Sequence, residues 1–353
     1  MTKADSLSVT DAESGTAITS AVLEQGETLS VEVAAKYLLR DVYMEKRRSG
    51  LISMLLIIFT QSVVYFSLIR AGVLAMPEPK AFPFAATVIG GLLFGLGALI
   101  ANGCITTTLV KVGDGRLAGF MSLFSFMIVG VASQKGFLSP LVAKLRAVGK
   151  VQDGLLAALP VAPLWVAVLG LALVLGWAFY DRKTAKPPFV PPAQYHGARH
   201  LFFEKIWSVY AAAVLIGVFA GLSYAFSKTM TGTPSAWGIT GGVTGWLRGM
   251  TEGGAVKWAQ FFVLGIVLGS FVCTYGSGEF SFKGTDGATL LRAMAGGALM
   301  AFGSVLGGGC IVGHGLSGTA RLSLTSWVAF ASITLGIWAG VRLFYKDAIV
   351  TKK

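Results

Sequence analysis

The sequence predicts an all-α fold, a polytopic membrane helical bundle with two pseudo-symmetric repeats whose broken or re-entrant helices carry Gly–Cys motifs. The composition, the apolar segments and an internal repeat predict it. Of the 353 residues, 54% are hydrophobic and 13% are charged, and the mean hydropathy is +0.70. Because a soluble domain carries about 25% charged residues, we expect most of this chain to meet lipid.

Apolar segments of roughly 20 residues, the length that crosses a bilayer, recur along the chain. The expected segments are 51–76, 85–104, 117–132 and 161–180 in the first half and 207–226, 258–273, 288–310 and 326–344 in the second. The polar stretches between them divide the chain into five parts. These are an N-terminal tail (1–38), a first membrane repeat (39–180), a proline-rich linker (181–206), a second membrane repeat (207–346) and a C-terminal tail (347–353).

The net charge of +12 does not indicate a nucleic-acid partner. The basic residues flank the apolar segments, which is the pattern that membrane topology produces, and they form no basic face with interleaved aromatics. The three cysteines are too few for a disulfide framework and show no Cys/His metal spacing. The sequence therefore predicts no nucleic acid, no metal and no cofactor.

An internal repeat links the two halves. The segment "IGGLLFGLGALIANGCI" from Ile89 aligns without a gap with "AGGALMAFGSVLGGGCI" from Ala295. The identical pairs are Gly90/Gly296, Gly91/Gly297, Leu93/Leu299, Gly97/Gly303, Gly103/Gly309, Cys104/Cys310 and Ile105/Ile311. We expect the earlier glycines to permit close helix packing, and the Gly–Cys pairs to interrupt their helices.

Interrupted helices inside a bilayer have a restricted set of uses. Irregular backbone survives there only if it is buried in protein or lines a wet cavity, and paired interruptions in two repeats indicate a substrate site. A half-helix that begins after the break directs free N–H groups at an anion, and we expect the stretch Gly313–Gly315 to extend the second break. The candidate substrate-binding residues are Asn102, Gly103, Cys104, Thr106, Gly309, Cys310, Gly313 and His314.

Other polar residues are expected to be secondary. Cys273 has no partner in the repeat and is interpreted as packing, and His314 as a polar pore residue rather than a base, because no acid is near. Asp114 and Glu279 lie at segment edges and are weak candidates for an ion relay. The sequence around both cysteines carries no positive charge, which favours passage of an anion over its retention.

Several motifs together resemble the YeeE/YedE family of bacterial inner-membrane transporters, which includes thiosulfate transporters. The resemblance runs from about Leu39 to the C-terminus. It implies a helical bundle with cysteines on a narrow central path, and it places Cys104 and Cys310 there. The motifs are "RDVYM", "TVIGGLLFGLGALIANGC", "AVLIG", "VLGSFVCTYGSGEF" and "MAFGSVLGGGCIVGHGL".

The family resemblance also sets the expected activity. It implies a multi-pass protein of the cell inner membrane, not an enzyme, that takes up a small sulfur-containing anion, with thiosulfate as the first expectation. A small sulfur-carrier protein on the cytoplasmic side is a further expected partner, beside the lipid bilayer.

The N-terminus departs from the family pattern. The family usually opens with an apolar segment that ends in a cysteine before the motif "RDVYM", whereas this chain has "VEVAAKYLL" after a polar tail. The first half is therefore expected to lack both that cysteine and a counterpart of the segment 258–273.

Three alternatives remain open at this point. The chain could transport another sulfur or selenium species, or act as a subunit that recruits a partner. It could also be a membrane thiol–disulfide protein that uses Cys104 and Cys310 as a redox pair. That last function requires the two Cα atoms to lie within about 7 Å.

Overall fold

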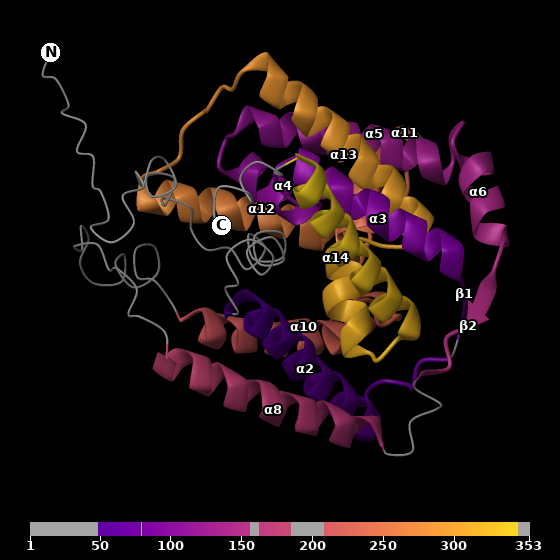
Figure 1. Cartoon of the computed structure of the whole chain (residues 1–353), viewed down its shortest axis with the longest axis vertical. Helices are drawn as coiled ribbons and strands as arrows, with labels where there is room; N and C mark the ends of the chain where they lie inside the picture. Colours follow the sequence, from indigo (N-terminus) through magenta and orange to yellow (C-terminus); the bar gives the residue numbers. More distant parts are fainter. Residues whose placement is uncertain (1–48, 79, 156–161, 185–207, 345–353) are drawn as a thin grey trace, which may run out of the picture.

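The computed structural model describes residues 49–78, 80–155, 162–184 and 208–344 (Figure 1). The first half contains α2 (Ser49–Arg70), β1 (Ala81–Pro83), α3 (Phe84–Ile100), α4 (Ile105–Gly113), α5 (Leu117–Gln134), α6 (Ser139–Ala147), β2 (Lys150–Gln152) and α8 (Pro163–Thr184). The second half contains α10 (Val209–Thr231), α11 (Ile239–Glu252), α12 (Trp258–Ser277), α13 (Gly287–Gly307), the short π-helix η2 (Val312–Gly318) and α14 (Leu324–Phe344).

The predicted all-α membrane bundle is confirmed. Within the described ranges, eight helical stretches are long and apolar enough to cross a membrane. One of them, Phe84–Gly113, contains the first Gly–Cys break. Helix α8 runs past the expected end of the first repeat, while most of the linker 181–206 and both predicted tails lie outside the described residues.

Helices α3 and α13 form the centre of the bundle, and glycines of the repeat bring them together. A Cβ atom built at Gly90 would lie 2.6 Å from the carbonyl oxygen of Gly303, and one built at Gly303 would lie 2.6 Å from the backbone nitrogen of Phe94. Side chains at these positions would force the helices apart. The expected packing role of these glycines is therefore confirmed.

The two halves exchange equivalent contacts around this central pair. Helix α3 packs against α14, and α13 packs against α5. Equivalent glycines make these contacts, because a Cβ at Gly91 would lie 2.7 Å from Ser332 Cβ and one at Gly297 would lie 3.0 Å from Ser122 Oγ. Each central helix thus packs against the long helix that follows the break in the other half, which is α14 after η2 and α5 after α4. The contacts support the predicted pseudo-symmetry.

Helix α2 links the two halves of the bundle. It packs against η2, as α12 packs against α4. The Ser62 hydroxyl donates to the Ala320 carbonyl after η2, and the Ser270 hydroxyl lies 3.0 Å from the Val110 carbonyl of α4. The expected lack of a first-half counterpart of the segment 258–273 concerns the chain before "RDVYM", which lies outside the described residues.

A side layer completes the arrangement. Helix α2 packs between α8 and α10, and Figure 1 shows these three helices grouped beside the rest of the bundle. Their shared core includes Ile52, Leu56 and Val174. Helix α2 is therefore mostly buried, while α12 directs several large apolar side chains outward. The two helices therefore lie in unlike surroundings.

A small two-stranded β-sheet is attached to the start of α14. Strands β1 and β2 pair antiparallel, with Phe82 opposite Val151. Asp153, just after β2, accepts hydrogen bonds from the Leu324 backbone N–H at 2.8 Å and from the Thr325 hydroxyl at 2.9 Å. Burial alone would raise the pKa of Asp153, but the hydrogen bonds from Ser323, Leu324 and Thr325 outweigh it and lower the pKa. The carboxylate thus caps α14 from a distant segment.

We expect Asp153→Ala to speed hydrogen exchange at the Leu324 and Thr325 amides, because it removes the acceptor of both N–H groups. Since folding lowers the pKa of Asp153, its stabilisation is complete above the ordinary value of 3.8 and is lost as the pH falls through the folded-state pKa. Asp153→Asn keeps a capping oxygen and should remove this pH dependence. Unchanged exchange in the alanine variant would show that Asp153 does not hold α14.

Candidate functional site

The two Gly–Cys breaks have the same backbone design. Helix α3 ends at Ile100 and is followed by Asn102 with φ 51°, while α13 ends at Gly307 and is followed by Gly308 with φ 90°. These left-handed residues occupy equivalent repeat positions. Glycine adopts this conformation without strain, and asparagine is among the residues that tolerate it best. Both helices therefore stop at the same point, which confirms the predicted interruptions.

The breaks lie toward opposite ends of the central helix pair. A Cβ at Gly296, in the first half of α13, would lie 2.6 Å from Ala101 Cβ beside the first break. The second break instead adjoins Gly90, near the start of α3. The stretch from Gly296 to Gly308 corresponds to a rise of about 18 Å along a helix. Asn102 and Gly308 are both exposed, so each break has its own opening.

Cys104 and Cys310 are buried just behind these openings. Each side chain is 1% exposed, and both belong to the hydrophobic cluster that fills the centre of the bundle. Cys104 occupies the N-cap position of α4, and its Sγ lies 3.6 Å from Thr107 Oγ1. The Cys310 carbonyl accepts from the His314 backbone N–H at 2.9 Å. Neither cysteine is in a disulfide, so each keeps an S–H group that can act as a weak hydrogen-bond donor.

Thr106 provides a polar atom without a partner near the first break. Its side chain is 0% exposed, and within the described part of the chain its hydroxyl oxygen has no hydrogen-bond partner. A buried hydroxyl without a partner is costly. Thr106 lies in the first turn of α4, two residues after Cys104. A polar ligand at the break would remove this cost.

His314 lies against the second break. A Cβ at Gly309 would lie 2.9 Å from both Cδ2 and Nε2 of the ring, and Nδ1 lies 3.2 Å from Ser326 Oγ. Its described side-chain partner is a hydroxyl rather than a carboxylate. This setting supports the interpretation of His314 as a polar lining group, because no carboxylate is seen to orient it as a base.

Helix η2 corrects the expected extent of the second break. The chain is helical from Val312 to Gly318, although Gly313 and Gly315 predicted an interruption there. It adopts the wider π-helical form, which is rare and often occurs at functional sites. A Cβ at Gly313 would meet nothing within 4 Å. Close packing therefore does not explain this glycine, and its role in substrate binding stays a prediction.

Two basic side chains overturn the expectation that no positive charge lies near the cysteines. Lys111 Nζ donates to the Asn102 carbonyl at 2.7 Å, at the first break. Arg146 Nη1 donates to the Val305 carbonyl at 3.0 Å, and its Nη2 would lie 3.6 Å from a Cβ at Gly308. Lys111 follows Cys104 by two helical turns, so helical periodicity could have found it. Arg146 reaches the site only through tertiary packing.

The secondary candidates remain outside this arrangement. Asp114 Oδ1 accepts from the hydroxyls of Ser270 and Thr274, each at 2.7 Å, and so joins the end of α4 to α12. Cys273 is only half-buried and lies outside the central cluster. These contacts are those of packing groups, as the sequence indicates for Cys273.

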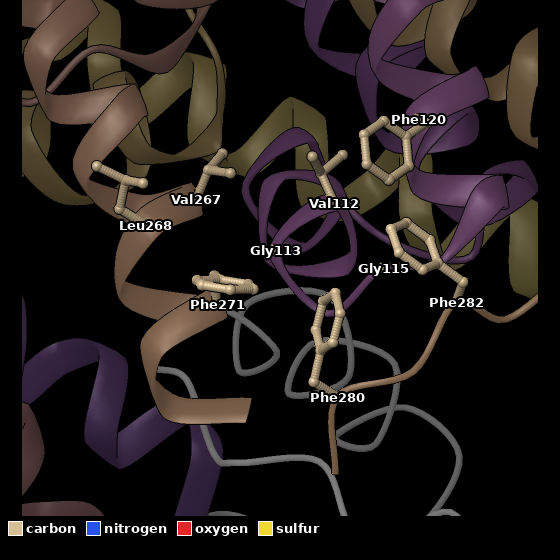
Figure 2. A pocket seen from close by; sticks show the side chains of 9 residues that line it. All are labelled: Val112, Gly113, Gly115, Phe120, Val267, Leu268, Phe271, Phe280 and Phe282. Atoms are coloured by element: carbon tan, nitrogen blue, oxygen red, sulfur yellow. The ribbon is translucent and has the colours of Figure 1, made fainter. Parts of the chain in front are cut away.

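A separate hollow of about 310 Å³ lies between α4, α5 and α12 (Figure 2). Phenylalanine rings dominate its lining, and Phe280 meets the Phe271 ring edge-on with centroids 5.1 Å apart. The lining contains no charged side chain and none of the candidate residues. An anion would lose its hydration there without replacement. The hollow is therefore not part of the candidate site.

We expect Gly309→Val to block transport through the second break. The added Cβ would lie 2.9 Å from the His314 ring, so the side chain would displace that ring and occupy space at the opening. Initial uptake rates measured beside Gly269→Ala on α12, where a Cβ would also meet nothing within 4 Å, provide the comparison. Wild-type uptake in Gly309→Val would show that the substrate does not pass this break.

The fold and the paired breaks together define a polytopic membrane transport protein. Comparison with known proteins gives the family: the chain belongs to the sulphur transport family, whose pattern matches residues 33–339.

Two relatives match along most of this chain. The thiosulfate transporter TsuA of Escherichia coli K12 is 34% identical over 310 residues, which is 87% of each chain. The thiosulfate transporter TsuA of Spirochaeta thermophila is 28% identical over 300 residues, covering 81% of this chain and 85% of the relative. A protein of Xylella fastidiosa named a probable transporter is 32% identical over 124 residues, or 35% of this chain. The family implied by the sequence motifs is thereby confirmed.

Proposed function

We propose that this chain transports thiosulfate along a narrow path that joins the two breaks and is lined by Cys104 and Cys310. The observation that carries the proposal is the pair of breaks, built alike and open toward opposite ends, each with a buried thiol behind it. The similarity to two proteins named thiosulfate transporters supports the choice of substrate.

The chemistry of the site suits this anion. Thiosulfate is a small dianion with a soft terminal sulfur, and a neutral thiol offers that sulfur a weak S–H donor. The first backbone N–H groups of α4 and the hydroxyl of Thr106 can donate hydrogen bonds to the thiosulfate oxygens. Weak neutral donors permit release as well as binding, which conduction requires. Asn102, Gly103, Gly309, Gly313 and His314 complete the proposed lining.

The proposal includes a location and a partner. We place the protein in the cell inner membrane and assign uptake as the direction of transport. A small sulfur-carrier protein on the cytoplasmic side would receive the anion. The apolar spans and the family support a membrane transporter rather than an enzyme.

The test is uptake of radiolabelled thiosulfate by proteoliposomes that contain the purified full chain. We expect saturable uptake that unlabelled thiosulfate suppresses and sulfate, which lacks the soft sulfur, suppresses far less. Empty liposomes are the control. A preference for a selenium analogue would reassign the substrate. Absence of any flux, together with reversible formation of a Cys104–Cys310 disulfide, would replace the proposal with the redox alternative.

A further inference from the structure

One basic side chain lies at each opening of the proposed path. Lys111 Nζ lies 2.7 Å from the carbonyl oxygen of Asn102 and would lie 3.6 Å from a Cβ at Gly103. At the other opening, the Arg146 guanidinium binds the Val305 carbonyl and adjoins Gly308. Both side chains are partly exposed, whereas the cysteines behind them are buried. Positive charge therefore lies at the openings, and the thiols lie deeper.

The internal repeat does not generate these two cations. The residue at the position of Lys111 in the second half is Ser317, and Arg146 belongs to α6, which lies outside the repeated segment. Two unrelated parts of the chain therefore place a cation at equivalent points of the two breaks. Lys111 also lies within an apolar stretch of spanning length, where an ionisable residue marks a substrate or ion pathway by default.

The carbonyl contacts explain how the cations are held. Lysine and arginine side chains near helix C-termini bind the last carbonyls and favour the negative end of the helix dipole. Here the accepting residues are Val305 in the last turn of α13 and Asn102 just beyond α3. These hydrogen bonds hold each cation beside an exposed break.

We propose that Lys111 and Arg146 capture the substrate dianion, one at each opening, before it passes to the adjacent cysteine. This inference rests on the proposed transport of thiosulfate. The Arg146 guanidinium can bind two oxygens of an oxyanion at once, whereas the Lys111 ammonium acts as a point charge. Because both side chains are partly exposed, water and salt weaken the attraction. Weakened attraction allows the anion to leave again.

Uptake from each face of the membrane tests this proposal. Right-side-out and inverted membrane vesicles give the KM for thiosulfate from the two faces separately. We expect Lys111→Gln to raise KM about tenfold from one face, and Arg146→Gln to raise it about tenfold from the other, since a charged hydrogen bond is lost in each. The maximal rates should change little. Raising the salt concentration should affect the variants less than the wild type at the altered face.

Charge-conserving and matched variants complete the experiment. Lys111→Arg and Arg146→Lys should recover most of the affinity. Lys144→Gln removes an exposed charge from α6 and Arg292→Gln removes one from α13, and both should leave KM unchanged. Thiosulfate-dependent thermal stabilisation of the purified variants gives a second readout, so that a variant with low expression still reports on binding.

The outcomes separate this inference from the transport proposal. Active wild-type protein with an unchanged KM from both faces in the two Gln variants would overturn the inference and leave transport standing. Equal effects of a variant from both faces would overturn the assignment of one cation to each opening. Inactive wild-type protein would overturn both proposals together.

Discussion

Replacing either Cys104 or Cys310 with alanine is expected to abolish thiosulfate uptake while leaving the amount of folded protein nearly unchanged. Each substitution removes one S–H donor from the path. The two thiols lie at equivalent positions of different breaks, so neither can replace the other. Removing one sulfur atom from a buried site creates only a small cavity. Uptake of labelled thiosulfate, normalised to protein recovered in the membrane, measures the effect.

Cys273→Ala is the matched control for these two variants. Cys273 lies on α12, half-buried and outside the central cluster, so its alanine variant should retain substantial uptake. A dead Cys273 variant beside active Cys104 and Cys310 variants would show that the repeat identifies the wrong sulfur atoms.

Gly90→Ala is expected to destabilise the whole bundle. The new Cβ would lie 2.6 Å from the Gly303 carbonyl oxygen, which is a backbone atom at the crossing of α3 and α13. The helices must separate to admit it, and overpacking of this kind costs about 1–3 kcal/mol, occasionally more. A lower thermal unfolding temperature in detergent, with a loss of uptake, is the expected result.

Gly176→Ala tests whether this effect is specific to the crossing. Gly176 lies on α8, where a Cβ would meet nothing within 4 Å, and alanine has the higher helix propensity. This variant should therefore be as stable as the wild type or slightly more stable. Equal stability of Gly90→Ala would mean that α3 and α13 do not approach as closely as described.

The sequence predicts the central features because they repeat. Residues matched in the two halves identified the packing glycines Gly90 and Gly303 as well as the broken helices before Cys104 and Cys310. The common left-handed residue was not predicted, because Asn102 and Gly308 differ in type and only the backbone conformation relates them.

Features formed by tertiary contacts could not be predicted in this way. Arg146 is distant in sequence from Gly308, and only the packing of α6 brings it there. Helix α2 packs against η2 although the two are distant in sequence. The glycines of η2 indicated an interruption, yet the chain forms a π-helix there that packs against α14 and α2. Local propensity is overridden there by packing.

The central claim is that two breaks open to opposite faces and share one substrate. The chain has three cysteines, so Cys273→Ala combined with Cys310→Ala or Cys104→Ala leaves a single thiol at one break. The direct measurement is the rate at which a membrane-impermeant thiol reagent, applied to right-side-out or inverted vesicles, modifies that thiol. We predict that Cys104 reacts from one face and Cys310 from the other, and that thiosulfate slows both reactions while sulfate does not. Reaction of both thiols from the same face, or rates that thiosulfate leaves unchanged, would contradict the account.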